Sequence, residues 1–176
     1  MTASPAKSLP CIGFLTVIEH AELGLVGGYL ILNAAGRPLE FHCTAPVKPN
    51  RAQEILYGPT LRPFLVGEQI GQTLLNKSKL TPLLVCTDLA DVLAVRDHTH
   101  LPVALVEANK GSEISHAHAA FTVGRNELLL PAPYAGDEQI IREHWPAQAE
   151  HLDLTEPFTR IREALEEAQK AARQAA

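Results

Sequence analysis

The sequence is short of the features by which common enzyme classes are recognised. Its 176 residues include only 3 cysteines, which lie far apart and form no CxxC pair, so a disulfide framework is not indicated. Aromatic residues make up 5% of the chain, too few for an extended surface on which nucleic-acid bases stack. The phosphate-binding patterns GxxxxGK[ST] and GxGxxG are absent, and so is the serine-nucleophile pattern GxSxG.

Positive charge is also scarce. The chain has 15 Lys+Arg against 20 Asp+Glu, a formal net charge of -5, and its basic residues form no cluster. Proteins that bind DNA or RNA usually concentrate positive charge, because neutralising phosphates supplies most of their affinity. The composition therefore predicts no nucleic-acid partner.

Long hydrophobic runs are missing. The longest apolar run, LGLVGGYLIL, has ten residues, about half of the roughly 20 that cross a bilayer. The first ten residues, MTASPAKSLP, lack the apolar segment of a signal peptide. We expect no membrane partner and a cytoplasmic protein in a reducing compartment.

What is present is an ordinary globular composition, with 46% hydrophobic and 20% charged residues. We expect a flexible tail over residues 1–10 and a single globular domain over residues 11–176. The predicted fold class is α/β or α+β, with a mixed sheet of five or six strands. The fold also includes an N-terminal β-hairpin, one βαβ unit, helices packed on the sheet and an amphipathic C-terminal helix over residues 156–175.

Local patterns place these elements. Two strand-like runs flank Asn33-Ala34-Ala35-Gly36, where Gly36 supplies the positive φ of a hairpin turn. The runs PLLVCT and PVALVE are continuously apolar, as in strands covered on both faces. A helix between them, capped by Asp88, predicts a parallel pair. A second hairpin is expected around Gly124-Arg125-Asn126.

The proline-rich stretch TAPVKPNRAQ predicts the start of a helix and the first candidate site. Asn50 and Gln53 form a capping-box pattern, so the helix begins at Arg51. We expect it to turn three apolar residues towards the core: Ala52, Ile55 and Leu56. Lys48 and Arg51 flank the positive end of this helix, where an anion would bind.

The second candidate lies on the preceding strand. Because a strand alternates faces, Leu39, Phe41 and Cys43 share one face, and Glu40 and His42 share the other. The apolar set predicts the core side, with Cys43 a small buried side chain. His42 beside the Glu40 carboxylate is either half of an acid–base site or part of a solvated strand face.

Two HxH pairs form the third candidate, a metal site. His98 and His100 belong to DHTH, and His116 and His118 belong to SHAH. On an extended segment, residues two apart face the same way, which suits two imidazoles on one metal. The cofactor itself stays open.

The carboxyl ends of the predicted parallel strands are the fourth candidate. Ligands of open α/β sheets bind outside these ends. Here they carry Cys86 and Asp88 after the first strand and Lys110 after the second. Cys86 is therefore either a thiol activated by the nearby helix N-terminus or an ordinary buried thiol at the end of an apolar strand.

The C-terminal helix bears on partners. An apolar stripe along it follows a 3-4 spacing close to heptad positions: Phe158, Ile161, Leu165, Ala168, Ala172 and Ala175. The stripe either docks on its own domain or contributes to a homodimer or a protein partner.

Together these features favour a protein-interaction or self-association module without catalysis. The first alternative binds a small anion or small molecule, or is an enzyme. Its site would combine the helix N-terminus near Asn50 with the strand ends at 86–88 and 107–111, through His42, Lys48, Asn50, Arg51, Asp88 and Lys110. The second alternative is a metal-dependent hydrolase that uses the HxH pairs.

Overall fold

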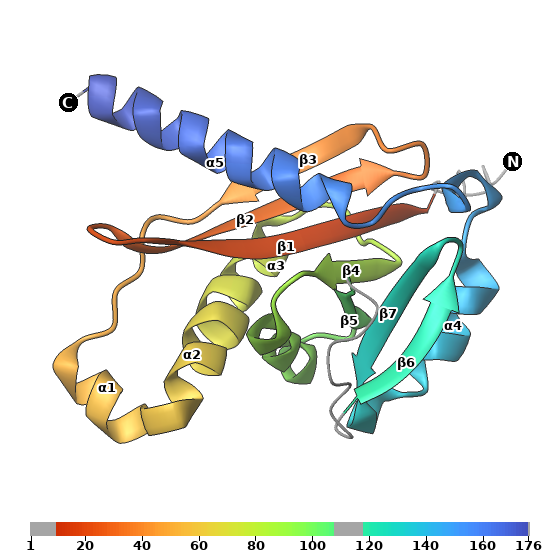
Figure 1. Cartoon of the computed structure of the whole chain (residues 1–176), viewed down its shortest axis with the longest axis horizontal. Helices are drawn as coiled ribbons and strands as arrows, with labels where there is room; N and C mark the ends of the chain where they lie inside the picture. Colours follow the sequence, from red (N-terminus) through yellow and green to blue (C-terminus); the bar gives the residue numbers. More distant parts are fainter. Residues whose placement is uncertain (1–9, 108–117, 176) are drawn as a thin grey trace, which may run out of the picture.

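The centre of the molecule is a mixed sheet of seven strands in the order β3-β2-β1-β4-β5-β7-β6 (Figure 1). It comes from a computed structural model, which describes residues 10–107 and 118–175; nearly all of the expected N-terminal tail lies outside them. The strands are β1 (Cys11–His20), β2 (Gly24–Asn33), β3 (Pro38–Cys43), β4 (Leu84–Thr87), β5 (Val103–Val106), β6 (His118–Val123) and β7 (Asn126–Pro131). Strands β1, β4 and β5 are parallel, and the remaining pairs are antiparallel.

The helices follow in chain order. After β3 the helical path runs through α1 (Arg51–Tyr57), the 3₁₀ turn η1 (Gly58–Thr60), α2 (Leu61–Pro63), the π-helical η2 (Phe64–Gly71) and α3 (Gln72–Lys77). The 3₁₀ helix η3 (Ala90–His98) connects β4 to β5. The others are η4 (Ala132–Tyr134), α4 (Asp137–His144), η5 (Ala147–Ala149) and α5 (Glu156–Gln174). The predicted fold class is confirmed, with seven strands in place of five or six.

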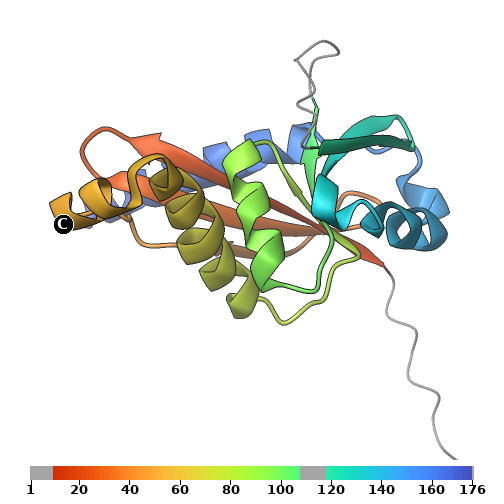
Figure 2. The same cartoon turned by 90° about the horizontal axis from the view of Figure 1, so that it is seen from below.

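The helices cover both faces of the sheet. Helix α5 lies on one face, while η2, α3 and η3 lie on the other (Figures 1 and 2). Each face has its own apolar core: Phe14, Leu30 and Phe158 belong to the α5 side, and Leu15, Tyr29 and Ile70 to the opposite side. The alternation of β1 and β2 between the two cores explains why their runs are almost continuously apolar.

Two adjacent glycines on β2 let both helix layers come close. A Cβ atom on Gly27 would lie 2.2 Å from Ile70 Cγ2, and one on Gly28 would lie 2.4 Å from Ile161 Cγ2. Because neighbouring residues of a strand face opposite sides, Gly27 accommodates η2 and Gly28 accommodates α5. The Gly-Gly pair therefore sets the spacing of both layers from the sheet.

Several local predictions are confirmed. The Asn33–Gly36 turn joins β2 to β3, with Gly36 at φ 84°, and Gly124 at φ 55° lies in the β6–β7 turn. The Asn50 side chain accepts from the Gln53 backbone N–H, and the Gln53 side chain accepts from the Asn50 N–H, which completes the capping box. Strands β4 and β5 form the predicted parallel pair.

Two side-chain predictions for helices fail. Helix α1 buries none of its residues: Ile55 and Leu56 are 64% and 81% exposed, because α1 extends beyond the sheet (Figure 1). Asp88 does not cap η3, whose N-cap is Leu89. In α4, Asp137 lies in the first turn, where its carboxylate pairs with Arg96 through Nε–Oδ2 and Nη2–Oδ1 distances of 2.8 and 3.2 Å.

Within residues 10–107 and 118–175, no helix has both the length and the apolar character needed to cross a bilayer.

We predict that Gly28→Ala lowers the free energy of unfolding by about 1–3 kcal/mol, because the new methyl group would displace Ile161 and Leu165 of α5. Urea unfolding at neutral pH measures this. Gly136→Ala is the matched control, since its Cβ would meet nothing within 4 Å and its φ is -65°. Equal stability of the wild type and Gly28→Ala would show that α5 does not pack closely on β2.

Candidate functional site

The orientation of β3 is the reverse of the predicted one. Leu39, Phe41 and Cys43 are exposed, whereas Glu40 and His42 are half-buried. The alternation itself is as expected, but β3 is the edge strand, and α5 packs over β1 and β2. The α5-facing side of β3 is therefore left open, while α3 packs against β3 on the other side.

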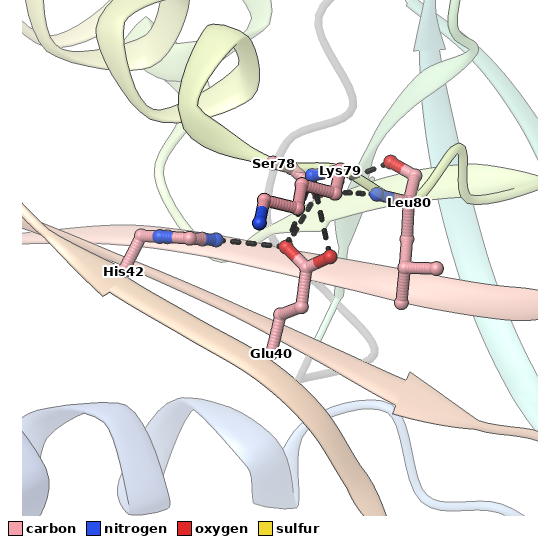
Figure 3. Close-up of polar contacts among 5 residues, drawn as sticks. All are labelled: Glu40, His42, Ser78, Lys79 and Leu80. Carbon is pink, nitrogen blue, oxygen red and sulfur yellow. Dashed lines mark hydrogen bonds and ion pairs between the residues drawn. The ribbon is translucent and has the colours of Figure 1, made fainter.

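The Glu40 carboxylate is the centre of a polar cluster that joins β3 to the turn after α3 (Figure 3). It contacts His42 Nε2 at 2.7 Å and accepts from Ser78 Oγ at 3.0 Å and from the Lys79 backbone N–H at 3.2 Å. The hydrogen bond from His42, together with those from Ser78 and Lys79, lowers the pKa of Glu40. Because its oxygens already accept from three groups, Glu40 anchors this turn and orients the imidazole of His42.

Asp88 lies where a ligand of an open α/β sheet is expected. The chain leaves β1 towards β2 on one side and leaves β4 towards β5 on the other, so the carboxyl ends of β1 and β4 form a switch point. Here the Asp88 carboxylate accepts from the buried Thr16 hydroxyl at 2.6 Å and pairs with Arg162 of α5. These contacts close the switch point on the α5 side.

The thiol at the end of β4 is inert rather than activated. Cys86 is fully buried on the α5 side, and burial raises the pKa of its thiol. Of the two alternatives for this residue, the buried strand thiol is confirmed. Cys43, predicted to be buried, is exposed instead.

Lys48 is held at a pocket by the connection that follows β3. This connection returns along β2: Leu25 and Val47 exchange two backbone hydrogen bonds of 2.8 Å, and Thr44 Oγ1 accepts from the Gly27 N–H at 2.9 Å. Gly24, at φ 97°, allows the approach, because a Cβ there would lie 2.4 Å from Val47 O and 2.6 Å from Lys48 Cγ. The position of Lys48 therefore depends on backbone contacts rather than on its own side chain.

The pocket has a volume of about 520 Å³ and combines an apolar floor with charged walls. Leu25, Leu61 and Leu65 are among its apolar lining residues. Its polar side chains come from three segments: Glu19 and His20 at the end of β1, Lys48 after β3, and Arg62 on α2. We call it the Lys48 pocket.

Electrostatically, the two cations of the Lys48 pocket differ. Arg62 is held by Glu19, with an Nη1–Oε2 distance of 3.5 Å, and by Asp91, with an Nε–Oδ2 distance of 3.1 Å. Lys48 forms no ion pair with any residue that the structure describes. The pocket thus offers one oriented guanidinium and one uncompensated ammonium, a combination suited to an anion.

The other predicted ligand-binding residues that the structure describes do not line the Lys48 pocket. Asn50 uses its side chain to cap α1, and Arg51 pairs with Glu54 with its side chain 81% exposed. His42 belongs to the Glu40 cluster and Asp88 to the switch point. Lys110 lies outside the described residues, so a ligand role for this residue stays a prediction.

None of the described histidines of the two HxH pairs lines the Lys48 pocket. His98 lies at the end of η3, where Nε2 is 3.5 Å from Glu68 Oε1, and His118 begins β6. Among the described residues, no three His, Cys, Asp or Glu side chains are grouped so that they would hold a metal ion. His116 lies outside these residues, so a metal site that combines His116 with His98, His100 and His118 stays a prediction.

Sequence reasoning missed Glu19, His20 and Arg62. No motif links them to Lys48, because they meet only after the connection 44–50 has folded back along β2. The available signal was the prolines at 46 and 49, which confine this connection without specifying its direction.

Neither a family model nor a curated protein matches the chain. Solved structures of Endonuclease V are similar to it. The catalytic domain of the human enzyme is 11% identical, covers 93% of this chain and 85% of its own, and has a TM-score of 0.45. Ciona intestinalis Endonuclease V in complex with a 24mer DNA is 10% identical to this chain. The match covers 93% of this chain and 89% of the Ciona chain, with a TM-score of 0.41. A variant of the Ciona enzyme in complex with a 23mer DNA is 8% identical to this chain. The match covers 72% of this chain and 72% of the Ciona chain, with a TM-score of 0.38.

These matches contradict the leading functional prediction. The similar proteins are endonucleases, and the two Ciona structures contain DNA. The predictions of a non-catalytic interaction or self-association module and of no nucleic-acid partner stand against these findings and are withdrawn. The predicted homodimer or protein partner on the C-terminal helix is corrected as well: Phe158, Ile161 and Leu165 are buried against the chain's own sheet. At these identities, we transfer no residue role from the similar structures.

We predict that Glu40→Gln lowers the free energy of unfolding at neutral pH by about 1–2 kcal/mol, because the hydrogen bonds to the carboxylate lose their charge. The folded-state pKa of Glu40 lies below its ordinary value of 4.5. Its contribution is therefore complete above pH 4.5 and is lost as the pH falls through the lower folded-state pKa.

Urea unfolding of both proteins above and below pH 4.5 measures the difference. Glu163→Gln on α5 is the control, since Glu163 is exposed and forms no ion pair within the described part of the chain. A difference between wild type and Glu40→Gln that stays constant across this range contradicts the assignment.

Proposed function

We propose that the protein binds a phosphate-bearing ligand in the Lys48 pocket. The observation that supports this most directly is the uncompensated Lys48 ammonium, which lines a pocket of about 520 Å³ together with the Arg62 guanidinium. Lysine binds phosphate as a point charge, and arginine binds it through a planar fork of N–H donors.

The contacts of Arg62 support a role in orienting the ligand. Glu19 and Asp91 engage Nη1 and Nε, so Arg62 keeps donors on Nη2 for a ligand oxygen while its plane is held from two sides. Such an oriented guanidinium loses less side-chain freedom on binding than a mobile one.

The apolar floor supports a ligand larger than free phosphate. Leu25, Leu61 and Leu65 form part of this floor, and Pro49 and Pro59 also line the pocket. A ligand that places a base or another flat apolar group on this floor and its phosphate between Lys48 and Arg62 would use both halves of the pocket. Nucleotides and nucleic-acid strands share this chemistry.

We place this function in the cytosol. All three cysteines are free thiols, and Cys43 is exposed, which suits a reducing compartment.

The experiment is a calorimetric titration at low salt with three probes: inorganic phosphate, a nucleoside monophosphate and a short single-stranded oligonucleotide. We expect Lys48→Ala to weaken binding of the phosphate-bearing probes about tenfold, because one charge-assisted contact is lost. A steep fall of oligonucleotide affinity with salt would identify a polynucleotide as the ligand, whereas tighter binding of the monophosphate would identify a free nucleotide.

Lys79→Ala is the matched control. Lys79 is an exposed lysine whose side chain forms no ion pair with a described residue, so its loss changes the net charge equally without touching the Lys48 pocket. Binding that is weakened equally by both substitutions, or that no probe shows, would refute the proposal.

A further inference from the structure

A second cavity lies on the opposite side of β2, under the C-terminal half of α5. This groove has a volume of about 410 Å³. Val26 and Cys43 line it on the side of the sheet, and Ala168, Gln169, Ala172 and Arg173 line it on the side of the helix.

The groove exists because the apolar stripe of α5 ends in alanine. Ile161 and Leu165 fill the space above Gly28, but the next positions of the stripe, Ala168 and Ala172, carry only a methyl group. The helix thus continues above the open face of β3 without filling the gap. Since Phe41 and Cys43 are exposed at this edge, the groove keeps an apolar lining that the protein itself does not cover.

Two polar groups give the groove a chemical preference. The Gln169 amide nitrogen is buried and has no hydrogen-bond partner among the described residues, although Gln169 lines the groove. At the end of the groove, Arg173 contacts His20 at 2.9 Å and pairs with no described carboxylate. A buried donor without an acceptor is costly, and an unpaired guanidinium attracts a carboxylate.

We propose that this groove binds a medium-chain fatty acid. The alkyl tail lies between α5 and β2 along Ala168 and Ala172. The carboxylate pairs with Arg173, and the Gln169 side chain turns its buried amide nitrogen into the groove to donate to it. A cavity of this size is within the usual range for small ligands, which spans roughly 300–1,000 Å³. The site is distinct from the Lys48 pocket, with which it shares no lining residue.

The exposed thiol in the groove provides the test. Cys43 lines the groove and is exposed, whereas Cys11 and Cys86 are buried, so a water-soluble thiol reagent reacts first at Cys43. We expect dodecanoate, kept below its micelle concentration, to slow this reaction saturably by about tenfold or more. Decanoate is expected to bind roughly tenfold more weakly, because two fewer methylenes are buried.

Matched variants locate the ligand. Ala172→Leu fills the groove from an exposed helix position and is expected to abolish the protection, while Ala171→Leu, one residue away and outside the lining, is expected to retain it. Ala168→Leu provides a second, independent filling. Arg173→Gln is expected to reduce dodecanoate binding to the level of dodecanol, which lacks the carboxylate.

Calorimetry on Cys43→Ala, with the same ligands, measures binding without the thiol. The proposal is overturned if dodecanoate neither protects Cys43 nor binds to Cys43→Ala. It is equally overturned if Ala172→Leu and Ala168→Leu bind as tightly as the wild type, or if dodecanol and dodecanoate bind the wild type equally.

Discussion

The close approach of two helix layers to β2 is the constraint on which the rest of the structure depends. Gly27 and Gly28 leave room for Ile70 on one face and Ile161 on the other. The placement of α5 brings Arg162 to Asp88 at the switch point, and the placement of η2 and α3 carries the Ser78–Lys79 turn to Glu40. The two long-range polar contacts are therefore consequences of apolar packing, and each holds a helix layer in the position that packing has already selected.

This arrangement redirects ligand access. In an open α/β sheet the crevice between diverging strands receives the ligand, but here Thr16, Asp88 and Arg162 occupy it on the α5 side. Because β1 continues past the end of β4, from Thr16 to His20, its last residues extend beyond that crevice. The accessible polar pocket lies at this extension, on the side of α2, rather than at the switch point itself.

The sequence predicted the elements whose determinants are local. These elements are the capping box at Asn50, the hairpin turn at Gly36 and the apolar runs of β4 and β5. The residues that determine each of them lie within a few positions of one another in the sequence. The misplaced side chains have a different cause. Phe41 and Ile55 are apolar residues with regular spacing, and their exposure follows from an edge strand and a projecting helix. Those are properties of the assembled sheet, and no pattern around either residue encodes them.

The two cavities show how one hairpin can build sites of opposite character. Leu25 of β2 lines the Lys48 pocket, and the next residue, Val26, lines the groove under α5, because successive residues of a strand turn to opposite faces. On one face, alanines on α5 leave apolar walls uncovered; on the other, the return of residues 44–50 along β2 brings Lys48 over Gly24. His20, which lines the pocket, and Arg173, which lines the groove, contact each other at 2.9 Å. A side-chain contact thus joins the rims of the two sites, and the chemistry of each site depends on which segment crosses the end of the same strand: α5 at the groove, and residues 44–50 at the Lys48 pocket.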